Sequence, residues 1–346
     1  MLPTRLYYRF KPFIPRGVRM GLRRWRAKGI LKKSADIWPI NEGAGNQPEG
    51  WKGWPDDHKF AFVLTHDVES QQGVDRVRQL AELEMELGFR SSFNFIPEGT
   101  YRVPDGLREW LVENGFEVGV HDLHHNGRLY NSRKKFRKSA ERINHHLKNW
   151  GAVGFRSGFM LRRLDWLHDL DISYDASTFD TDPFEPQPDG AKTIFPFVVS
   201  KGASRYVELP YTLPQDSTLF LTLGESSAEI WKRKLDWIIG KGGLALLNLH
   251  PDYVQFEGDA KKGKTFPAEY YRDFLEYVAK KMPGQCWLAL PKEVASWVES
   301  SLPERSPVSE NPKRICMVSF AYYEMDNRVL RYAEALAARG DAVDVL

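Results

Sequence analysis

The chain has 346 residues, with 49 Lys and Arg against 46 Asp and Glu, so its formal net charge is +3. Hydrophobic residues make up 42% and aromatic residues 13%, which is enough apolar side chain for a large core and excludes a wholly disordered protein. The two cysteines, Cys286 and Cys316, exclude a disulfide scaffold and a cysteine-based zinc cluster, and the longest apolar runs are too short to span a membrane.

The first 33 residues form a basic N-terminal arm. They hold 11 basic side chains and no acidic one, whereas the rest of the chain carries 38 basic and 46 acidic side chains. Apolar residues interleaved with Arg suit an anionic membrane surface or an acidic partner, although a solvated extension packed on the body also fits. The arm lacks the features of a secretory signal. We therefore expect a cytoplasmic protein, in contact with the inner face of the membrane, and no nucleic-acid partner.

Strand and helix patterns alternate after a loop-rich lead-in at 34–58. The predicted strands are 60–65, 91–96, 116–120, 152–155, 172–174, 206–209, 244–249 and 286–290. The predicted helices are 74–87, 105–113, 132–150, 161–170, 227–239, 268–281 and 292–299. Such alternation indicates a parallel α/β sheet, and about seven or eight units over 59–301 favour a distorted (β/α) barrel. The four prolines of 178–196 predict a long loop near the site.

A second pattern begins after the barrel. Residues 302–312 have the composition of a linker. Residues 313–346 restart the alternation, with a strand at 314–320, a helix at 327–339 and a strand from 342, as in a partial Rossmann-like βαβ segment. Because 34 residues cannot close a core of their own, this tail either docks on the barrel or opens a further domain.

Polar clusters follow five of the predicted strands, each at the carboxyl end of its strand. They are Thr65–Glu69, His121–His125, Arg156–Gly158, Asp175 and His250–Pro251. In an α/β barrel all of these strand ends open onto one face, and that face carries the chemistry. The shared position predicts one functional site built from all five clusters.

Two of these clusters have the residue types of a metal site. His121 with His125, or His121 with His124, places two imidazoles on one side, and a carboxylate from Asp67 or Glu69 completes a His, His, carboxylate set with open positions. One of the two acids then binds the metal and the other stays free as a base. A lone histidine pair favours a surface or capping role, so the metal interpretation depends on the combination with the acidic pair and the further strand-end histidine.

The ordered clusters resemble the motifs of the polysaccharide deacetylases, carbohydrate esterase family 4 (CE4), the chitooligosaccharide deacetylase homology domain, over roughly residues 59–299. The matching stretches are Thr65–Glu69, His121–His125, Phe155–Gly158, Tyr174–Ser177 and Leu247–His250. Two positions depart from the family pattern. Val68 stands where a second adjacent aspartate is common, so that Glu69 resembles the variant that spaces its acids by one residue, and Gly158 replaces the usual proline.

This resemblance implies a metal-dependent hydrolase that removes an acetyl group from an N-acetylated sugar or glycan precursor, with a divalent metal, expected to be zinc. The roles that it implies are metal ligands at Glu69, His121 and His125, a general base at Asp67, an acid at His250, and supporting residues at Asp175 for His250 and at Arg156 for Asp67. Two alternatives stay open. One is a non-catalytic carbohydrate-binding barrel, which Val68 favours, and the other is an amidohydrolase acting on a small non-sugar amide.

The tail resembles the opening strand, helix and strand of a two-domain (GT-B) glycosyltransferase, at 314–320, 327–339 and 342–346. This resemblance implies a fused or partner glycosyltransferase acting on the same glycan. Many dinucleotide-binding folds also begin in this way, and the Gly-x-Gly-x-x-Gly pattern is missing.

Overall fold

A computed structural model describes residues 16–258, 260–261, 263–281, 283–301, 313–317, 329, 332–333, 336–337 and 341–345. The start of the basic arm, the predicted linker at 302–312 and most of the predicted helix at 327–339 lie outside these residues. The helices are α2 (Arg16–Lys33), α3 (Gln71–Glu86), α4 (Asp105–Glu113), α5 (Arg133–Trp150), α6 (Leu164–Leu167), α7 (Glu229–Lys241), α8 (Ala268–Lys281) and α9 (Pro291–Ser300).

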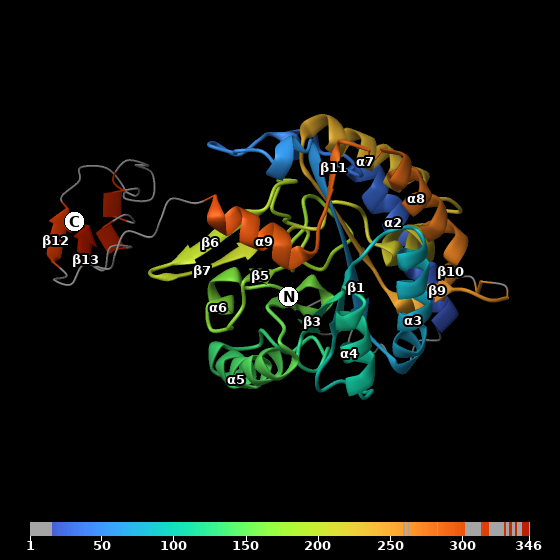
Figure 1. Ribbon diagram of the computed structural model, residues 1–346, viewed down its shortest axis with the longest axis horizontal. Coiled ribbons are helices and arrows are strands. Elements are labelled where there is room, and N and C mark those ends of the chain that lie inside the picture. Colours follow the sequence, from blue (N-terminus) through green and yellow to red (C-terminus); the bar gives the residue numbers. More distant parts are fainter. Residues whose placement is uncertain are drawn as a thin grey trace.

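A twisted sheet of mainly parallel strands lies at the centre, surrounded by helices (Figure 1). Its strands are β1 (Phe60–Val68), β2 (Ser92–Phe95), β3 (Glu117–His121), β4 (Gly154–Arg156), β5 (Tyr174–Asp175), β6 (Phe197–Lys201), β7 (Ser204–Glu208), β8 (Leu244–Leu249) and β11 (Cys286–Leu288). The order is β11-β1-β2-β3-β4-β5-β7-β6, and β8 also pairs with β1. An isolated parallel bridge from Leu213 to Leu247 joins the segment after β7 to β8. The sheet therefore curls into the distorted barrel that the alternation predicts.

The strand β1 anchors the barrel because all nine of its residues are buried. It pairs in parallel with β11 along its first half, with β2 along its second half and with β8 in between. Phe62 packs edge to face on Phe89 and contacts Phe274 from α8. A fully buried Phe contributes about 1.5–3 kcal/mol of transfer free energy, so this cluster holds the helices against the strand.

The β6–β7 hairpin differs from the predicted all-parallel alternation. These two strands are antiparallel, with Val198 opposite Val207 and a turn at Gly202, which has a positive φ of 57°. The strand β6 is half-buried to exposed along its length. Its apolar start, 197–199, follows directly on the proline-rich stretch 178–196 that is predicted as a loop, and its end is polar and exposed. The sequence analysis therefore identifies only the 206–209 part of the hairpin.

Two short strands of the tail, β12 (Arg314–Met317) and β13 (Ala342–Val345), pair in parallel in a sheet of their own. These strands confirm the 314–317 part of the strand predicted at 314–320 and the strand predicted from 342. Among the described residues, no helix is long and apolar enough to cross a membrane.

A buried acid at the amino end of β3 predicts a pH-dependent stability. Glu117 accepts hydrogen bonds from Tyr174 Oη (2.8 Å) and from the backbone N of Lys292 (3.1 Å). Burial outweighs these bonds and raises the pKa of Glu117 to about 7. The folded state thus holds this proton more tightly than the unfolded chain, whose glutamate has a pKa near 4.5. The contribution of Glu117 to stability is therefore fully present below about pH 4.5 and declines by roughly 3 kcal/mol as the pH rises to about 7.

Glu117→Gln should remove most of that loss, because the amide stays neutral at every pH. Urea unfolding of both proteins at pH 5 and pH 8 measures it. We expect the wild type to lose more free energy of unfolding than the variant between the two values. Each protein is compared with itself at the two pH values, so any pH-independent loss of stability from the lost Lys292 hydrogen bond cancels. An identical loss in both proteins would contradict the assignment to Glu117.

Candidate metal centre and catalytic residues

The first cluster lies at the carboxyl end of β1, where alternate side chains leave the strand on opposite sides. Thr65 and Asp67 face the barrel interior, where Arg156 meets both. His66 faces the other way and pairs with Glu84 on α3 at 2.7 Å, with both side chains fully buried. Val68 also belongs to the apolar core. The period of two along this strand therefore separates the polar site from the packing behind it.

Three side chains converge next to this strand end. One ligand atom from each of Glu69, His121 and His125 lies within 4.8 Å of the others. His125 Nε2 is 3.1 Å from Glu69 Oε1, and the centres of the two imidazole rings are 4.8 Å apart. His125 reaches this position from a loop residue with a positive φ of 49°. The structure thus brings together the three residues that the sequence predicts as metal ligands.

The hydrogen bonds of the two histidines fit a metal site. Nδ1 of His121 lies 3.2 Å from the carbonyl oxygen of Arg156, so this nitrogen carries the proton and Nε2 has a free lone pair. Among the described residues, Nε2 of His121 is buried without a hydrogen-bond partner, and Nε2 of His125 has only its contact with Glu69. Buried polar atoms are rarely left without one, and a backbone acceptor on the far nitrogen is typical of a metal-binding histidine. The donor set of two imidazoles and one carboxylate suits zinc.

His124 does not take part in this cluster. Its Nδ1 lies 2.9 Å from the backbone oxygen of Glu98, and 38% of its side chain is exposed. The sequence leaves open whether His121 pairs with His124 or with His125, and in the structure His121 lies with His125.

Charge within the cluster keeps Glu69 ionised. Burial by itself raises the pKa of Glu69, but the contact with His125 and the charges of His250, His125 and His121 outweigh it and lower the pKa to about 2. Burial lowers the pKa of His121. Tyr253 Oη donates to Glu69 Oε2 (3.1 Å), which leaves Oε1 facing the histidines. Burial also lowers the pKa of His125, but the contact with Glu69 outweighs burial and raises the pKa of His125. A cation binds an ionised carboxylate and neutral imidazoles, so metal binding would release the proton of His125.

The position of Glu69 is fixed by the segment that follows His250. The backbone N of Glu69 donates to Oδ2 of Asp252 (2.9 Å), and Ser70 Oγ donates to the other oxygen. A Cβ at Gly73 would collide with this carboxylate, so glycine permits the close approach of α3. Asp252 therefore ties the start of α3 and the first strand end to the last one.

Asp67 is held in the barrel interior by amides and a guanidinium. Its carboxylate accepts hydrogen bonds from Asn94 Nδ2 (3.1 Å) and Asn248 Nδ2 (2.9 Å), and Arg156 Nε lies 3.5 Å away. Burial raises the pKa of Asp67, but the charges of His121, Arg156 and His250 outweigh it and lower the pKa well below its ordinary value. Arg156 therefore lies beside Asp67, as the resemblance implies. Asn94 and Asn248 are site residues that the sequence analysis did not identify.

His250 is paired with Asp216, and this corrects the expectation for Asp175. Nδ1 of His250 lies 2.7 Å from Asp216 Oδ1, and the backbone N of His250 donates to the other oxygen (3.0 Å). Burial lowers the pKa of His250, but the Asp216 carboxylate and the charges of Glu69 and Asp67 outweigh it and raise the pKa to about 10. Nε2 of His250 lies 3.9 Å from Glu69 Oε1, so it faces the ligand cluster.

Asp175 lies elsewhere in the barrel wall. It accepts hydrogen bonds from the backbone N (3.1 Å) and Oγ (2.7 Å) of Ser177, and Ser177 Oγ in turn accepts from the backbone N of Ser157. Burial raises the pKa of Asp175, and it raises the pKa of its neighbour Glu208 further. Through Ser177, Asp175 therefore braces the loops after β4 and β5.

The loop after β4 closes one side of the site. A Cβ on Gly158 would lie 2.5 Å from Asp122 Oδ2 and 2.7 Å from His125 Cδ2, so a larger residue displaces His125. The next residue, Phe159, stacks on the His125 ring with centres 4.3 Å apart, and 36% of it is exposed. Glycine at 158 therefore leaves room for His125 in this position. Phe159 presents an exposed aromatic face beside it.

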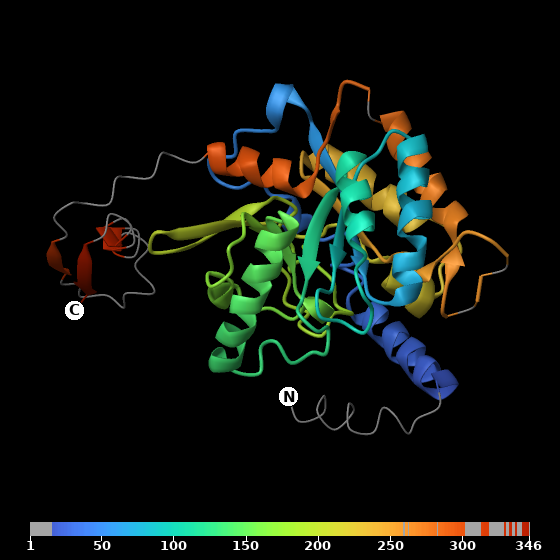
Figure 2. The same ribbon diagram turned by 60° about the horizontal axis from the view of Figure 1, so that its bottom comes forward.

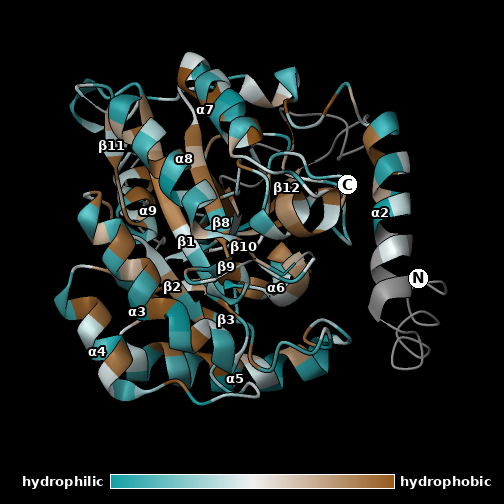
Figure 3. Ribbon diagram, turned by 90° about the vertical axis from the view of Figure 1, so that its right-hand side faces the viewer, coloured by the Kyte–Doolittle hydropathy of each residue, from teal (hydrophilic) through white to brown (hydrophobic). Residues whose placement is uncertain are grey.

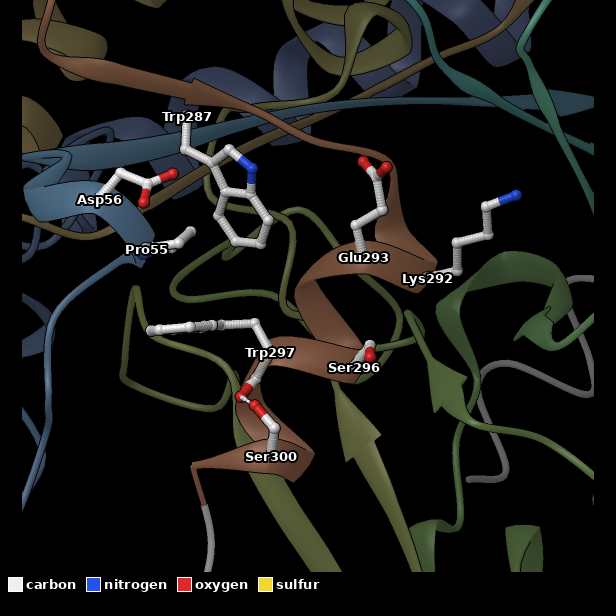
Figure 4. A pocket seen from close by; sticks show the side chains of 8 residues that line it. All are labelled: Pro55, Asp56, Trp287, Lys292, Glu293, Ser296, Trp297 and Ser300. Atoms are coloured by element: carbon white, nitrogen blue, oxygen red, sulfur yellow. Dashed lines mark hydrogen bonds between the residues drawn. The ribbon is translucent and has the colours of Figure 1, made fainter.

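An open pocket at the opposite end of the barrel holds none of these residues (Figure 4). It lies between α9 and the lead-in segment and is lined by Pro55, Asp56, Trp287, Lys292, Glu293, Ser296, Trp297 and Ser300. Several of its polar groups already have partners within the fold. Glu293 accepts from the backbone N of Leu290, and Trp297 Nε1 donates to the Gly53 oxygen. The pocket therefore lacks the convergent free polar groups of the strand-end site.

Comparison with known proteins shows the fold. No protein-family model and no curated protein sequence matches the chain. A provisionally assigned polysaccharide deacetylase from Mycobacterium smegmatis has a similar structure, with a TM-score of 0.57 and 19% identity over 73% of this chain and 95% of its own. A family 4 acetyl xylan esterase from Clostridium thermocellum, in complex with a cobalt ion, aligns with a TM-score of 0.41 and 12% identity over 70% and 93% of the two chains. A CE4 family pseudoenzyme from Bacillus anthracis aligns with a TM-score of 0.41 and 12% identity over 68% and 65%.

Proposed function

We propose that this chain is a metal-dependent deacetylase of the CE4 family that releases acetate from an N-acetylated sugar or glycan. The observation that carries the proposal is the convergence of Glu69, His121 and His125 beside a buried ionised Asp67 and a charged His250. The shared fold of the Mycobacterium smegmatis protein, which is itself described as a polysaccharide deacetylase, supports it. Fold alone does not establish activity, so the proposal rests on the residues of the site.

The metal would be held by Glu69 Oε1 and by Nε2 of His121 and His125. A divalent cation at this place supplies the positive charge that polarises an acetyl carbonyl oxygen. Three protein ligands leave further positions open, as a catalytic site requires. Zinc is the proposed metal because imidazole and carboxylate ligands in this number are those of its hydrolytic sites.

The protein's own groups would move the protons of the hydrolysis. Asp67 takes a proton from the attacking water as a new bond forms between the water oxygen and the acetyl carbon. The carbon–nitrogen bond then breaks, and Nε2 of His250 delivers its proton to the leaving nitrogen. Asp216 keeps His250 in its charged form and orients the ring through Nδ1. The products are acetate and the free amine of the sugar.

The structure weakens the main argument for a non-catalytic barrel. That alternative rests on Val68, which stands where the family often has a second aspartate. Val68 points into the apolar core and is fully buried, whereas Glu69 contributes a carboxylate to the site. An acid is therefore still present at this strand end, one position further along the chain, which supports the metal proposal.

Release of acetate and of primary amine decides among the three functions. We expect the zinc-loaded protein to release both in equal amounts from N-acetylglucosamine oligomers, and we expect a chelator to stop the reaction until zinc is restored. Acetanilide serves as the small non-sugar amide. Release from acetanilide alone would favour the amidohydrolase, and full metal occupancy with no release from any acetylated sugar would favour the binding barrel.

A further inference from the structure

The basic arm contains an amphipathic helix that the sequence analysis did not predict. Eight of the 18 residues of α2 are Arg or Lys, and none is Asp or Glu. Ala27 is buried against the body, and Arg24 and Ile30, three residues to either side of it and on the same side of the helix, are half-buried. The opposite side carries Trp25, which is 76% exposed, together with exposed basic residues at 26, 28, 32 and 33. One face thus docks on the barrel while the other presents cations and an indole ring to solvent.

This helix lies beside the candidate site. It packs against the π-helical segment Ser217–Leu223, which follows Asp216 directly, and Arg24 Nη2 donates to the Leu221 oxygen (3.5 Å). The chain beyond the helix contacts the loop after β5, where Trp38 packs edge to face on Phe184. Figure 2 shows α2 at the end of the barrel toward which the strand arrows point, and Figure 3 shows it along one side of the body.

A second group of cations lies at the same end of the barrel. The chain leaves β3 at His121 and enters α5 at Arg133, so α5 begins at the carboxyl end of the strands. Arg133 and Arg137 both contact Asp169, whereas exposed lysines at 134, 135 and 138 have no acidic partner among the described contacts. Cations at the amino end of a helix oppose its dipole. Helix stability therefore gives no reason for this placement, whereas an external anionic surface does.

We propose that α2 and the first two turns of α5 dock the strand-end face of the barrel onto an anionic lipid bilayer. Charge complementarity identifies an anionic bilayer as the partner, because two cationic elements flank one face of the barrel. One of them adds an exposed indole ring. Trp side chains favour the interface between lipid and water, and basic residues are drawn to anionic headgroups. A bilayer is flat enough to meet both elements at once. The proposal does not depend on the reaction, since neither element contributes a proposed catalytic residue.

Partitioning of the full chain onto vesicles tests this docking. We expect binding to vesicles of phosphatidylglycerol and phosphatidylcholine, weak binding to phosphatidylcholine alone, and a decline as salt screens the charges. Replacing Arg26, Lys28, Lys32 and Lys33 by Gln should lower the partition coefficient by roughly tenfold or more, because each basic residue near the surface adds attraction to the anionic headgroups. Trp25→Ala should weaken the binding that remains at high salt.

Two further variants test the orientation. Lys134, Lys135 and Lys138 replaced by Gln should also weaken binding, because they flank the same face. The matched control replaces three exposed lysines at the opposite end of the barrel, Lys52, Lys148 and Lys280, and should change binding less than about twofold. Thermal unfolding of each variant checks that the fold is intact. Equal losses in the α2 variant and the control would overturn the proposal, and so would binding to duplex DNA without binding to anionic vesicles.

Discussion

Asp67→Asn should lower the rate of acetate release by about two to four orders of magnitude while the protein keeps its metal. The variant preserves the shape of the side chain and removes the charge that accepts a proton. The proposed metal ligands are Glu69, His121 and His125, so their number does not change. Arg156 loses its buried partner, and we expect the fold to lose roughly 3 kcal/mol of stability for that reason. The rate and the metal content must therefore be measured well below the melting temperature.

Glu69→Ala is the matched comparison for this prediction. It removes a proposed ligand, so we expect both the metal and the turnover to be lost. Metal analysis of the two purified variants, with the rate measured on the same samples, separates the two acids. Retention of metal by Glu69→Ala together with its loss in Asp67→Asn would exchange their roles.

Asp216→Asn should move the alkaline limb of the pH–rate profile toward acid by at least about one unit and lower the maximal rate. Removing the carboxylate takes away the negative charge that stabilises the imidazolium of His250, so its proton dissociates at lower pH. The general acid is active only when protonated, so activity is lost earlier as the pH rises. Loss of an orienting carboxylate beside a catalytic histidine also costs rate, by as much as about 10⁴-fold in the best-studied triad.

Asp175→Asn is the control, because the sequence predicts for Asp175 the role that the structure gives to Asp216. Asp175 hydrogen-bonds Ser177, and the described contacts do not join it to His250. We therefore expect the alkaline limb to stay in place in this variant. The profiles of both variants, with metal content assayed in each, decide the matter. A shift in Asp175→Asn alone would restore the first assignment.

The barrel is predictable because its strands are buried and its helices amphipathic. The strand Leu244–Leu249 and the helix Asp105–Glu113 have the predicted bounds, since an apolar run and a 3.6-residue period mark them clearly. The hairpin strand β6 and the helix α2 are marked less clearly. The short apolar start of β6 adjoins a proline-rich stretch that is predicted as a loop, and the high charge of α2 obscures its narrow buried face.

The strand-end positions of the site residues are predictable, but their neighbours around the barrel are not. His250 and Asp175 both follow strands, and their order along the chain does not show which acid faces which base. The Leu213–Leu247 bridge brings the segment containing Asp216 against β8, whereas β5 pairs with β4 and β7. The stretch before Asp216 contains Pro214 and lacks a clear strand pattern, so only the tertiary pairing shows its place.

The central prediction is the position of the metal ion. A crystal structure of the zinc-loaded protein, with anomalous diffraction measured on both sides of the zinc absorption edge, locates the ion. We predict one zinc ion bound by Glu69 Oε1 and by Nε2 of His121 and His125, at about 2.0–2.2 Å from each. A zinc ion bound at other residues, or no ion at this place in crystals grown with excess zinc, would contradict the account.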